Sequence, residues 1–361
     1  MSDVGCRSSD VGRRSSDLGP PTSDLRLVTA LAFLVCCALA LAPPAAAQLI
    51  PDFGSDRAGT SGFQFLKITV DPRAAAMGET VAANAFDASA LFWNPALAAQ
   101  APRAQIGFSH AAYYADVAVS YAAAYRRFGS FTLGLSLQAL NSGEMDVTTE
   151  FRPYGTGEQF RWIDMGIGLS VAQRLTDLFS YGVTARYVRE SVAGLVTQTA
   201  VFDLGVFYRI GDTGAQMAVA MRNFGFDASP AGELERIVIG GEGRVVEDEF
   251  ESITPPTTFL FGITYEMLRD DPRNRLLLSG QLNNPNDNSE NFNVGAEYTW
   301  SDLLVLRAGY RIGIEEYSIP SLGAGFLVPG LGDGLGLRLD YAFTNLERLG
   351  TVHRVGVNVE I

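Results

Sequence analysis

Few side chains in this 361-residue sequence have the types and spacing that catalysis or metal binding requires. All three cysteines lie within the first 37 residues, and the two histidines, His110 and His353, stand far apart. Neither a thiolate site nor a histidine-based zinc site is therefore expected. No Ser-His-Asp or paired-carboxylate arrangement stands out, and the glycines of 240–243 do not join a strand to a helix as in a phosphate-binding loop. We predict no enzymatic activity, no metal and no cofactor.

Three charged residues ahead of the strand-rich region are candidate ligand-binding groups: Asp71, Arg73 and Asp87. The simpler interpretation is that they form salt bridges or cap a short helix. The two histidines suggest a proton switch. His353, however, shares its alternation phase with Val355, which favours a packing or interfacial role.

The charge balance argues against a nucleic-acid partner. The formal net charge is −13, and the basic residues are 26 Arg and a single Lys, with no basic run. An acidic chain without clustered cations binds the phosphate backbone poorly.

From residue 103 onward, apolar residues alternate with polar residues or glycine at a period of two. Phe131, Leu133 and Leu135, for example, are separated by Thr132 and Gly134. The same pattern recurs over 163–171, 179–187, 258–267 and 292–300. Successive side chains of a strand point to opposite faces, so each segment has one apolar and one polar face.

Three features favour a transmembrane barrel over a soluble sandwich, which would show the same alternation. The strands are longer than the five or six residues usual in sandwiches. Aromatic residues, including Trp162 and Trp300, tend to lie at strand ends, as in the girdles of outer-membrane barrels. The polar face is rich in Arg, carboxylates and glycine, which suits a crowded interior; its charged members are Arg186, Glu190, Asp203, Arg209, Arg222, Glu266, Glu297, Arg307, Arg311, Arg338 and Asp340. Because an open sheet edge in lipid would leave backbone groups unpaired, we predict an all-β, closed antiparallel barrel.

We expect about fourteen strands, with boundaries accurate to a few residues. They are 103–114, 117–128, 131–142, 161–173, 178–190, 199–210, 214–223, 258–268, 275–283, 292–300, 303–314, 319–327, 335–343 and 352–361. An even number allows both termini to lie on one side, which would be periplasmic.

The predicted connections alternate in length. Those that leave odd-numbered strands include 143–160, 191–198, 224–257, 284–291 and 344–351, whereas those that leave even-numbered strands are short turns. Long loops on one side and short turns on the other are typical of outer-membrane barrels, whose short turns are periplasmic.

The N-terminus is predicted to be a targeting segment. Residues 1–25 are an over-extended start or a low-complexity leader, and 26–47 form a signal peptide whose apolar run ends in an A-x-A site at Ala47. Residues 48–102 would form a hatch, or plug, and 103–361 the barrel. The predicted location is the bacterial outer membrane.

The stretch FLKITVDPRAAAMGETVAANAFDASALFWNPALAA resembles the N-terminal signature of the PorV/PorQ family of outer-membrane barrels, which are distantly similar to FadL fatty-acid transporters. The matching elements are Phe65 to Ile68, Asp71 to Ala74, Met77-Gly78, Asp87 to Ser89 and Trp93 to Ala96. The C-terminal segment from Asp340 to Ile361 is similar to that family's closing hairpin. Ile361 differs from that pattern, because barrels of this kind often end in an aromatic residue that the assembly machinery recognises.

The resemblance implies a fourteen-stranded barrel with the N-terminal segment folded inward. The residues of the hatch motif are Asp71, Arg73, Gly78, Asp87, Trp93, Asn94 and Pro95. Asp87 is expected to cap a short helix over 88–92. Because a residue before proline is disfavoured in helices, that helix should end near Trp93, with the indole against the inner wall.

Three functions follow as expectations. The resemblance to PorV implies assistance to protein export of the type IX secretion kind, with a translocon and secreted proteins as partners and the long loops as contact surfaces. FadL-like uptake would place a hydrophobic ligand in the lumen. A structural role would involve only outer-membrane lipid and the barrel-assembly machinery.

Overall fold

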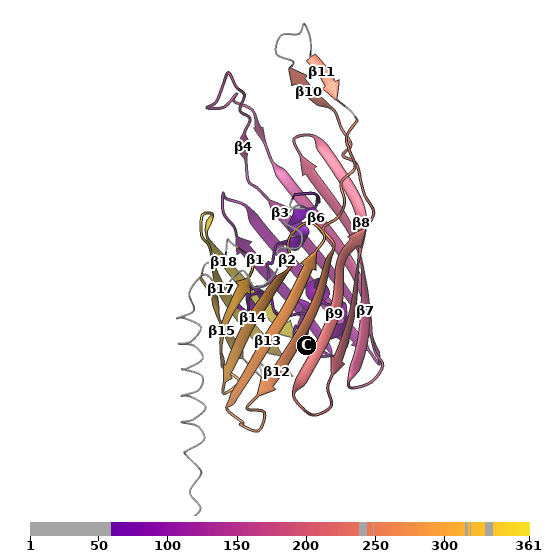
Figure 1. Cartoon of the computed structure of the whole chain (residues 1–361), viewed down its shortest axis with the longest axis vertical. Coiled ribbons are helices and arrows are strands. Elements are labelled where there is room, and N and C mark those ends of the chain that lie inside the picture. Colours follow the sequence, from indigo (N-terminus) through magenta and orange to yellow (C-terminus); the bar gives the residue numbers. More distant parts are fainter. Residues whose placement is uncertain (1–58, 238–243, 248, 315–316, 318, 329–334) are drawn as a thin grey trace, which may run out of the picture. The chain divides into compact units, whose positions relative to one another are not determined.

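The computed structural model describes residues 59–237, 244–247, 249–314, 317, 319–328 and 335–361. Fourteen strands in this part of the chain form one closed barrel in the order β1-β18-β17-β16-β15-β14-β13-β12-β9-β8-β7-β6-β3-β2 (Figure 1). Every neighbouring pair is antiparallel. The predicted fold class is confirmed. No helix among these residues is long and apolar enough to cross a membrane.

The strand bounds lie close to those predicted. The barrel strands are β1 (Ala104–Ala112), β2 (Ala118–Phe128), β3 (Phe131–Asn141), β6 (Trp162–Arg174), β7 (Phe179–Val192), β8 (Leu195–Arg209), β9 (Ala215–Gly225), β12 (Thr258–Met267), β13 (Asn274–Pro285), β14 (Asn291–Trp300), β15 (Leu304–Ile312), β16 (Ser321–Val328), β17 (Gly336–Leu346) and β18 (Gly350–Glu360).

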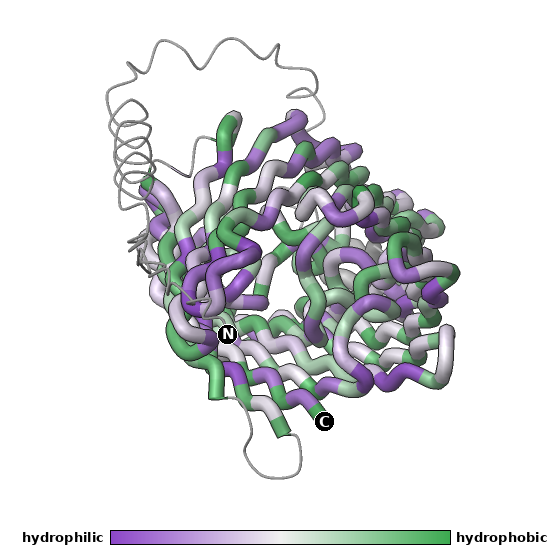
Figure 2. Tube along the Cα trace, turned by 90° about the horizontal axis from the view of Figure 1, so that it is seen from below, coloured by the Kyte–Doolittle hydropathy of each residue, from purple (hydrophilic) through white to green (hydrophobic). Residues whose placement is uncertain are grey.

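The alternation places apolar side chains on the outside of the barrel and polar ones in the lumen. In β3, Leu133, Leu135 and Leu137 are exposed, whereas Thr132 and Ser136 are buried. Figure 2 shows the same alternation of hydropathy along the strands around the ring. An apolar outer face suits hydrocarbon, and the enclosed polar face is available to bind the hatch.

One end of the barrel, the short-turn end, carries brief connections such as 129–130, 175–178, 210–214 and 268–273. The opposite end, the long-loop end, carries 142–161 and 226–257. These two loops contain small hairpins that the sequence analysis did not predict: β4 (Met145–Asp146) with β5 (Gln159–Phe160), and β10 (Leu234–Ile237) with β11 (Arg244–Glu247). Both hairpins project beyond the same end in Figure 1.

The predicted loop at 191–198 is wrong. β7 continues to Val192 and β8 begins at Leu195, so only Ala193 and Gly194 connect them. Both have positive φ, 49° and 88°, as a two-residue hairpin turn of the primed type requires. Val192 before the turn and Val196 and Thr197 after it favour strand, so the ladder extends to the turn.

The hatch occupies the lumen and supplies most of the buried apolar core. It contains η3 (Gln64–Lys67), α2 (Pro72–Ala76), α3 (Ala90–Trp93) and η4 (Pro95–Ala99). The predicted leader and signal peptide and the first residues of the predicted hatch lie outside the described residues. Ile361 follows β18 at the short-turn end.

Candidate functional site

The hatch runs lengthwise through the barrel from one end to the other. At the long-loop end, Gly62 N–H donates to the carbonyl of Thr254 (3.1 Å), in the connection that precedes β12. At the short-turn end, Gln100 Nε2 donates to the carbonyl of Thr176 (3.3 Å). The segment between these two contacts is almost wholly buried, so the hatch occupies the lumen from one end to the other.

The entry of the hatch is held by one acidic residue. Asp287, in the connection between β13 and β14, accepts hydrogen bonds from Lys67 Nζ (2.7 Å) and Gln64 Nε2 (2.6 Å). This contact could not be predicted from the sequence because Lys67 and Gln64 lie 220 and 223 residues from Asp287.

Asp71 and Arg73 work together at the start of α2. The Asp71 carboxylate accepts from the backbone N–H of Ala74 (3.0 Å) and, more weakly, of Arg73 (3.4 Å), and Pro72 occupies the first helical position. The capped turn directs Arg73 toward β14, where Nε and Nη2 contact the Glu297 carboxylate at 2.8 and 3.1 Å. Such a bidentate pair fixes orientation as well as charge.

Gly78 makes a turn that only glycine accommodates easily. Its φ is +62°, and a Cβ there would lie 2.8 Å from the backbone nitrogen of Tyr310 in β15. On the barrel side, the inward glycines Gly295 and Gly309 face the backbone of Met77. Glycine on both surfaces therefore allows the hatch backbone to touch the wall.

Asp87 is buried beside β17, but it is not the N-cap of a helix over 88–92 as expected. The helix α3 begins only at Ala90, with Ser89 before it. The Asp87 carboxylate accepts instead from Ser89 N (2.8 Å) and pairs with Arg338 on β17. The ion pair with Arg338 and the hydrogen bond from Ser89 hold the Asp87 carboxylate away from the position of a helix N-cap.

These contacts belong to one chain of alternating charges. Arg307 pairs with Glu297 (2.6 Å) and with Asp340 (2.6 Å), and Asp340 also accepts from Arg338 Nε (2.7 Å). With Arg73 and Asp87 at its two ends, the network holds three arginines and three carboxylates. Because the charges balance, the ionised groups are tolerated although their side chains are largely buried.

Trp93 packs against the inner wall, as expected. Its ring lies 4.9 Å from the guanidinium carbon of Arg222 on β9, and the Phe92 ring lies 4.0 Å from the same atom. Arg222 has no ion pair among the described residues; it donates to the carbonyl of Leu66 (3.3 Å). Cation–π contact therefore stabilises a buried arginine.

The Asn94-Pro95 step ends α3 and starts η4. Asn94 is extended (φ −160°), and its Oδ1 accepts from the N–H of Ala96 (3.0 Å). The step lies against glycines of the wall, where a Cβ on Gly182 would approach the carbonyl carbon of Pro95 to 2.7 Å. The Asn-Pro pair thus stops one helix and fits the chain closely to β7 and β8.

The two histidines lie apart from the hatch. His353 faces outward on β18, where its Nδ1 is 2.7 Å from the hydroxyl of Tyr341. His110 Nδ1 is 2.9 Å from Ser120 Oγ across β1 and β2. No group of three or more metal-ligating side chains occurs in the described part of the chain.

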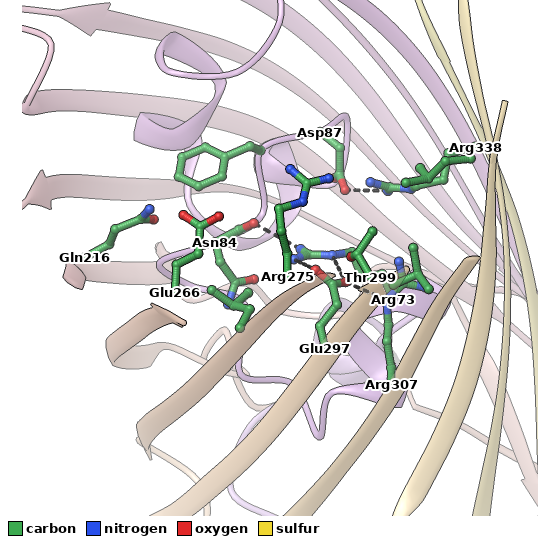
Figure 3. A pocket seen from close by; sticks show the side chains of 14 residues that line it. Arg73, Asn84, Asp87, Gln216, Glu266, Arg275, Glu297, Thr299, Arg307 and Arg338 are labelled. Carbon is green, nitrogen blue, oxygen red and sulfur yellow. Dashed lines mark hydrogen bonds and ion pairs between the residues drawn. The ribbon is translucent and has the colours of Figure 1, made fainter. Parts of the chain in front are cut away.

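A cavity of about 260 Å³ lies between the hatch and the short-turn end (Figure 3). Arg73, Asn84 and Asp87 contribute from the hatch, and β9 and β12 to β17 supply the wall. Glu266 and Arg338 appeared in the sequence as polar-face residues, whereas Asn84 carried no signal because its place depends on tertiary packing. Ten of its fourteen lining residues are polar or charged, which suits a hydrophilic ligand better than a hydrocarbon.

The long-loop end carries acidic and aromatic side chains. The loop 226–257 contains eight carboxylates and two arginines, and 142–161 contains four carboxylates and two arginines. At the tip of the β4–β5 hairpin, Phe151 and Tyr154 are 84% and 99% exposed. Exposed aromatic residues on a projecting loop are candidates for protein contact.

Comparison with known proteins supports the resemblance. The family model for the type IX secretion system protein PorV matches residues 53–225. No curated protein sequence matches the chain.

Solved structures of similar fold are named as channels and transporters. The CymD monoaromatic hydrocarbon channel is 15% identical, with 80% of this chain and 96% of that chain covered and a TM-score of 0.52. The toluene transporter TbuX of Ralstonia pickettii is 13% identical, with 83% of this chain and 98% of that chain covered and a TM-score of 0.53. The toluene transporter TodX of Pseudomonas putida is 15% identical, with 80% of this chain and 96% of that chain covered and a TM-score of 0.52. At such identities the likeness shows the fold alone. The chain thus folds as a closed β-barrel of the outer-membrane type, similar in fold to these channels, and its residues 53–225 are similar to the PorV family.

Proposed function

We propose that this barrel assists protein export at the cell surface, in the manner of a type IX secretion component, and that the long-loop end is its contact surface. The observation that carries the proposal is the filled lumen combined with two projecting hairpins. A barrel that is blocked inside and elaborated at one end is suited to binding other proteins. The match to the PorV model supports the same role.

The interior argues against passage of hydrophobic solutes in this conformation. A hydrocarbon would have to cross the paired charges around Glu297 and Asp340, where it cannot replace their hydrogen bonds. Lateral escape would require strands to separate. The register of β3 with both neighbours, however, is continuous from Phe131 to Asn141. Uptake remains the second candidate because the FadL-like neighbours are named as hydrocarbon channels.

The partner is expected to be basic or polar at its contact surface. The acidic excess of 226–257 gives complementary attraction to cationic groups, which raises association rates and favours such partners. Phe151 and Tyr154 would supply the apolar anchors within the interface.

The test is capture of partners from native outer membranes. A variant in which a short turn replaces 226–257 should lose co-purifying translocon components, whereas replacement of the largely exposed turn 268–273 at the other end should not. Heat-modifiable mobility on gels checks that both barrels are intact. Unchanged capture by the loop variant would refute the assignment of this surface.

Uptake is tested in parallel on the same strains. Accumulation of radiolabelled toluene should match that of cells without the barrel. Accumulation that depends on the barrel, together with normal export in the deletion strain, would replace the export proposal by transport.

A further inference from the structure

The cavity beneath the hatch opens toward the short-turn end and contains an unusual surplus of hydrogen-bond acceptors. Its wall residues lie at strand ends: Gln216 is the second residue of β9, Glu266 the last but one of β12, and Arg275 the second of β13. Arg275 is about half exposed, which marks the mouth.

Every arginine that lines the cavity already has a carboxylate partner. Arg73, Arg307 and Arg338 are bound within the charge network, and Arg275 pairs with Asp302. None of these cations is free to hold an anionic ligand without breaking an existing pair. Binding of a phosphate or a carboxylate here is therefore disfavoured.

Two side-chain amide oxygens of the lining residues, in contrast, have no hydrogen-bond donor among the described residues. Asn84 is 3% exposed, and its Nδ2 donates to the carbonyl of Thr80 (3.0 Å) and to Ser279 Oγ (3.2 Å). These bonds fix the amide, and Oδ1 has no donor among the described residues. Gln216 is 8% exposed, and its Oε1 is likewise without a donor within that part of the chain.

A carboxylate completes this wall. Glu266 follows Thr264 by two residues and so shares its face, and Thr264 pairs directly with Gln216 across β9 and β12. No ion pair or hydrogen bond to the Glu266 carboxylate occurs within the described residues. Figure 3 shows Gln216 and Glu266 on the same side of the cavity, with Asn84 between them and the arginines.

We propose that this cavity binds an organic cation, an ammonium or guanidinium group of about amino-acid size, with Glu266 as its counter-ion and Gln216 and Asn84 as acceptors. Such groups carry several donors and no acceptor, which matches what the wall leaves unpaired. The volume of about 260 Å³ greatly exceeds the roughly 30 Å³ that one water takes in the liquid. The cation enters from the short-turn end, either free or as the side chain of a polypeptide.

The experiment is calorimetric titration of the full processed barrel in detergent with three probes. Agmatine represents a free cation, Nα-acetyl-argininamide represents a peptide side chain, and Nα-acetyl-citrullinamide is the neutral isostere of the latter. A cationic probe should bind at least about tenfold more tightly than the citrulline compound, because charged hydrogen bonds are the stronger ones. Binding of agmatine alone indicates a free cation, and binding of the peptide mimic indicates a polypeptide; either result supports the site.

Two variants locate the binding. Glu266→Gln keeps the shape and removes the charge, and it should weaken binding about tenfold or more. Asp177→Asn, on an exposed turn of the same end, is the matched control and should leave binding unchanged. Absence of binding by both cations, equal binding of the neutral isostere, or unchanged affinity in Glu266→Gln would overturn the proposal. Partner capture at the long-loop end is measured separately, so this outcome does not depend on the export role.

Discussion

Glu297 is the residue whose replacement best tests how the hatch is held. Its carboxylate joins Arg73 of the hatch to Arg307 of the wall, and both arginines are more than nine-tenths buried. Glu297→Gln keeps the size of the side chain and removes the charge. Arg307 retains Asp340, but Arg73 retains only the carbonyl of Asn84.

Loss of one partner from a buried pair typically costs about 3 to 5 kcal/mol. Because part of the network survives, we expect the lower value, about 3 kcal/mol. At 1.4 kcal/mol for each factor of ten, this increases the population of the undocked hatch about 100-fold.

The assay is thiol labelling of the hatch. The chain has no cysteine after residue 37, so Ala75→Cys, at a position 2% exposed, is a unique reporter in a protein that starts after residue 47. When opening is fast relative to labelling, the maleimide rate follows the open population. The rate should rise about 100-fold in Glu297→Gln.

Two controls sharpen the result. Glu144→Gln removes a similar ion pair, with Arg161, that is exposed at the long-loop end, and it should change the rate little. Combining Arg73→Met with Glu297→Leu removes both buried charges and should label more slowly than Glu297→Gln alone. Equal rates in Glu297→Gln and the parent would show that the ion network does not hold the hatch.

Three further predictions concern other parts of the molecule. Gly182→Ala should lower the temperature at which the heat-modifiable gel form is lost, because the added Cβ would lie 2.7 Å from the backbone of Pro95 and Ala96. Gly280→Ala is the control and should not lower it, because the nearest atom to its Cβ would lie at 3.4 Å. Burial opposes ionisation of Asp287, but hydrogen bonds from Lys67 and Gln64 outweigh it and hold the pKa of that carboxyl below its ordinary value. The contact therefore stabilises the hatch entry above about pH 4 and is lost as the pH falls below the lowered pKa. The hydrogen-exchange rates of residues 61–68, corrected for intrinsic rates, should rise at low pH in the parent protein. Asp287→Asn should show no such rise. In single-tryptophan variants, brominated lipids should quench Trp300, which shares the outward face of β14 with Tyr298, but not Trp93, which is buried. Trp162 should also escape quenching, because it lies on the inward phase of β6 and donates to the buried Asp164. Quenching of Trp93 would place the hatch outside the lumen.

The barrel could be predicted from the sequence because lipid imposes the same rule on every strand. An outward residue such as Leu135 must be apolar, so the period of two persists through fourteen segments. The turn at Ala193-Gly194 was missed because polar residues near it, such as Ser191 and Thr197, are also common in loops. Val192 and Val196, however, favour strand and extend the ladder to the turn.

The hatch contacts were harder to predict because they join residues far apart in the sequence. The acidic and basic residues of the polar face were recognised as mutually neutralising, but nothing in the sequence assigns Arg73 to Glu297, 224 residues away. Asn84 illustrates the limit: its amide is positioned by Thr80 and Ser279 together, which only the folded chain brings into contact.

The lengthwise path of the hatch has a consequence for biogenesis. β1 and β18 are neighbours, so the ladder from Gln105 with Glu360 to Ala112 with His353 is the seam where the rolled sheet meets itself. The helix α2 contacts β15 to β18, and the same segment continues through η4 into β1. The hatch therefore connects the last strands synthesised to the first one. It provides an internal surface around which the sheet can close into a barrel.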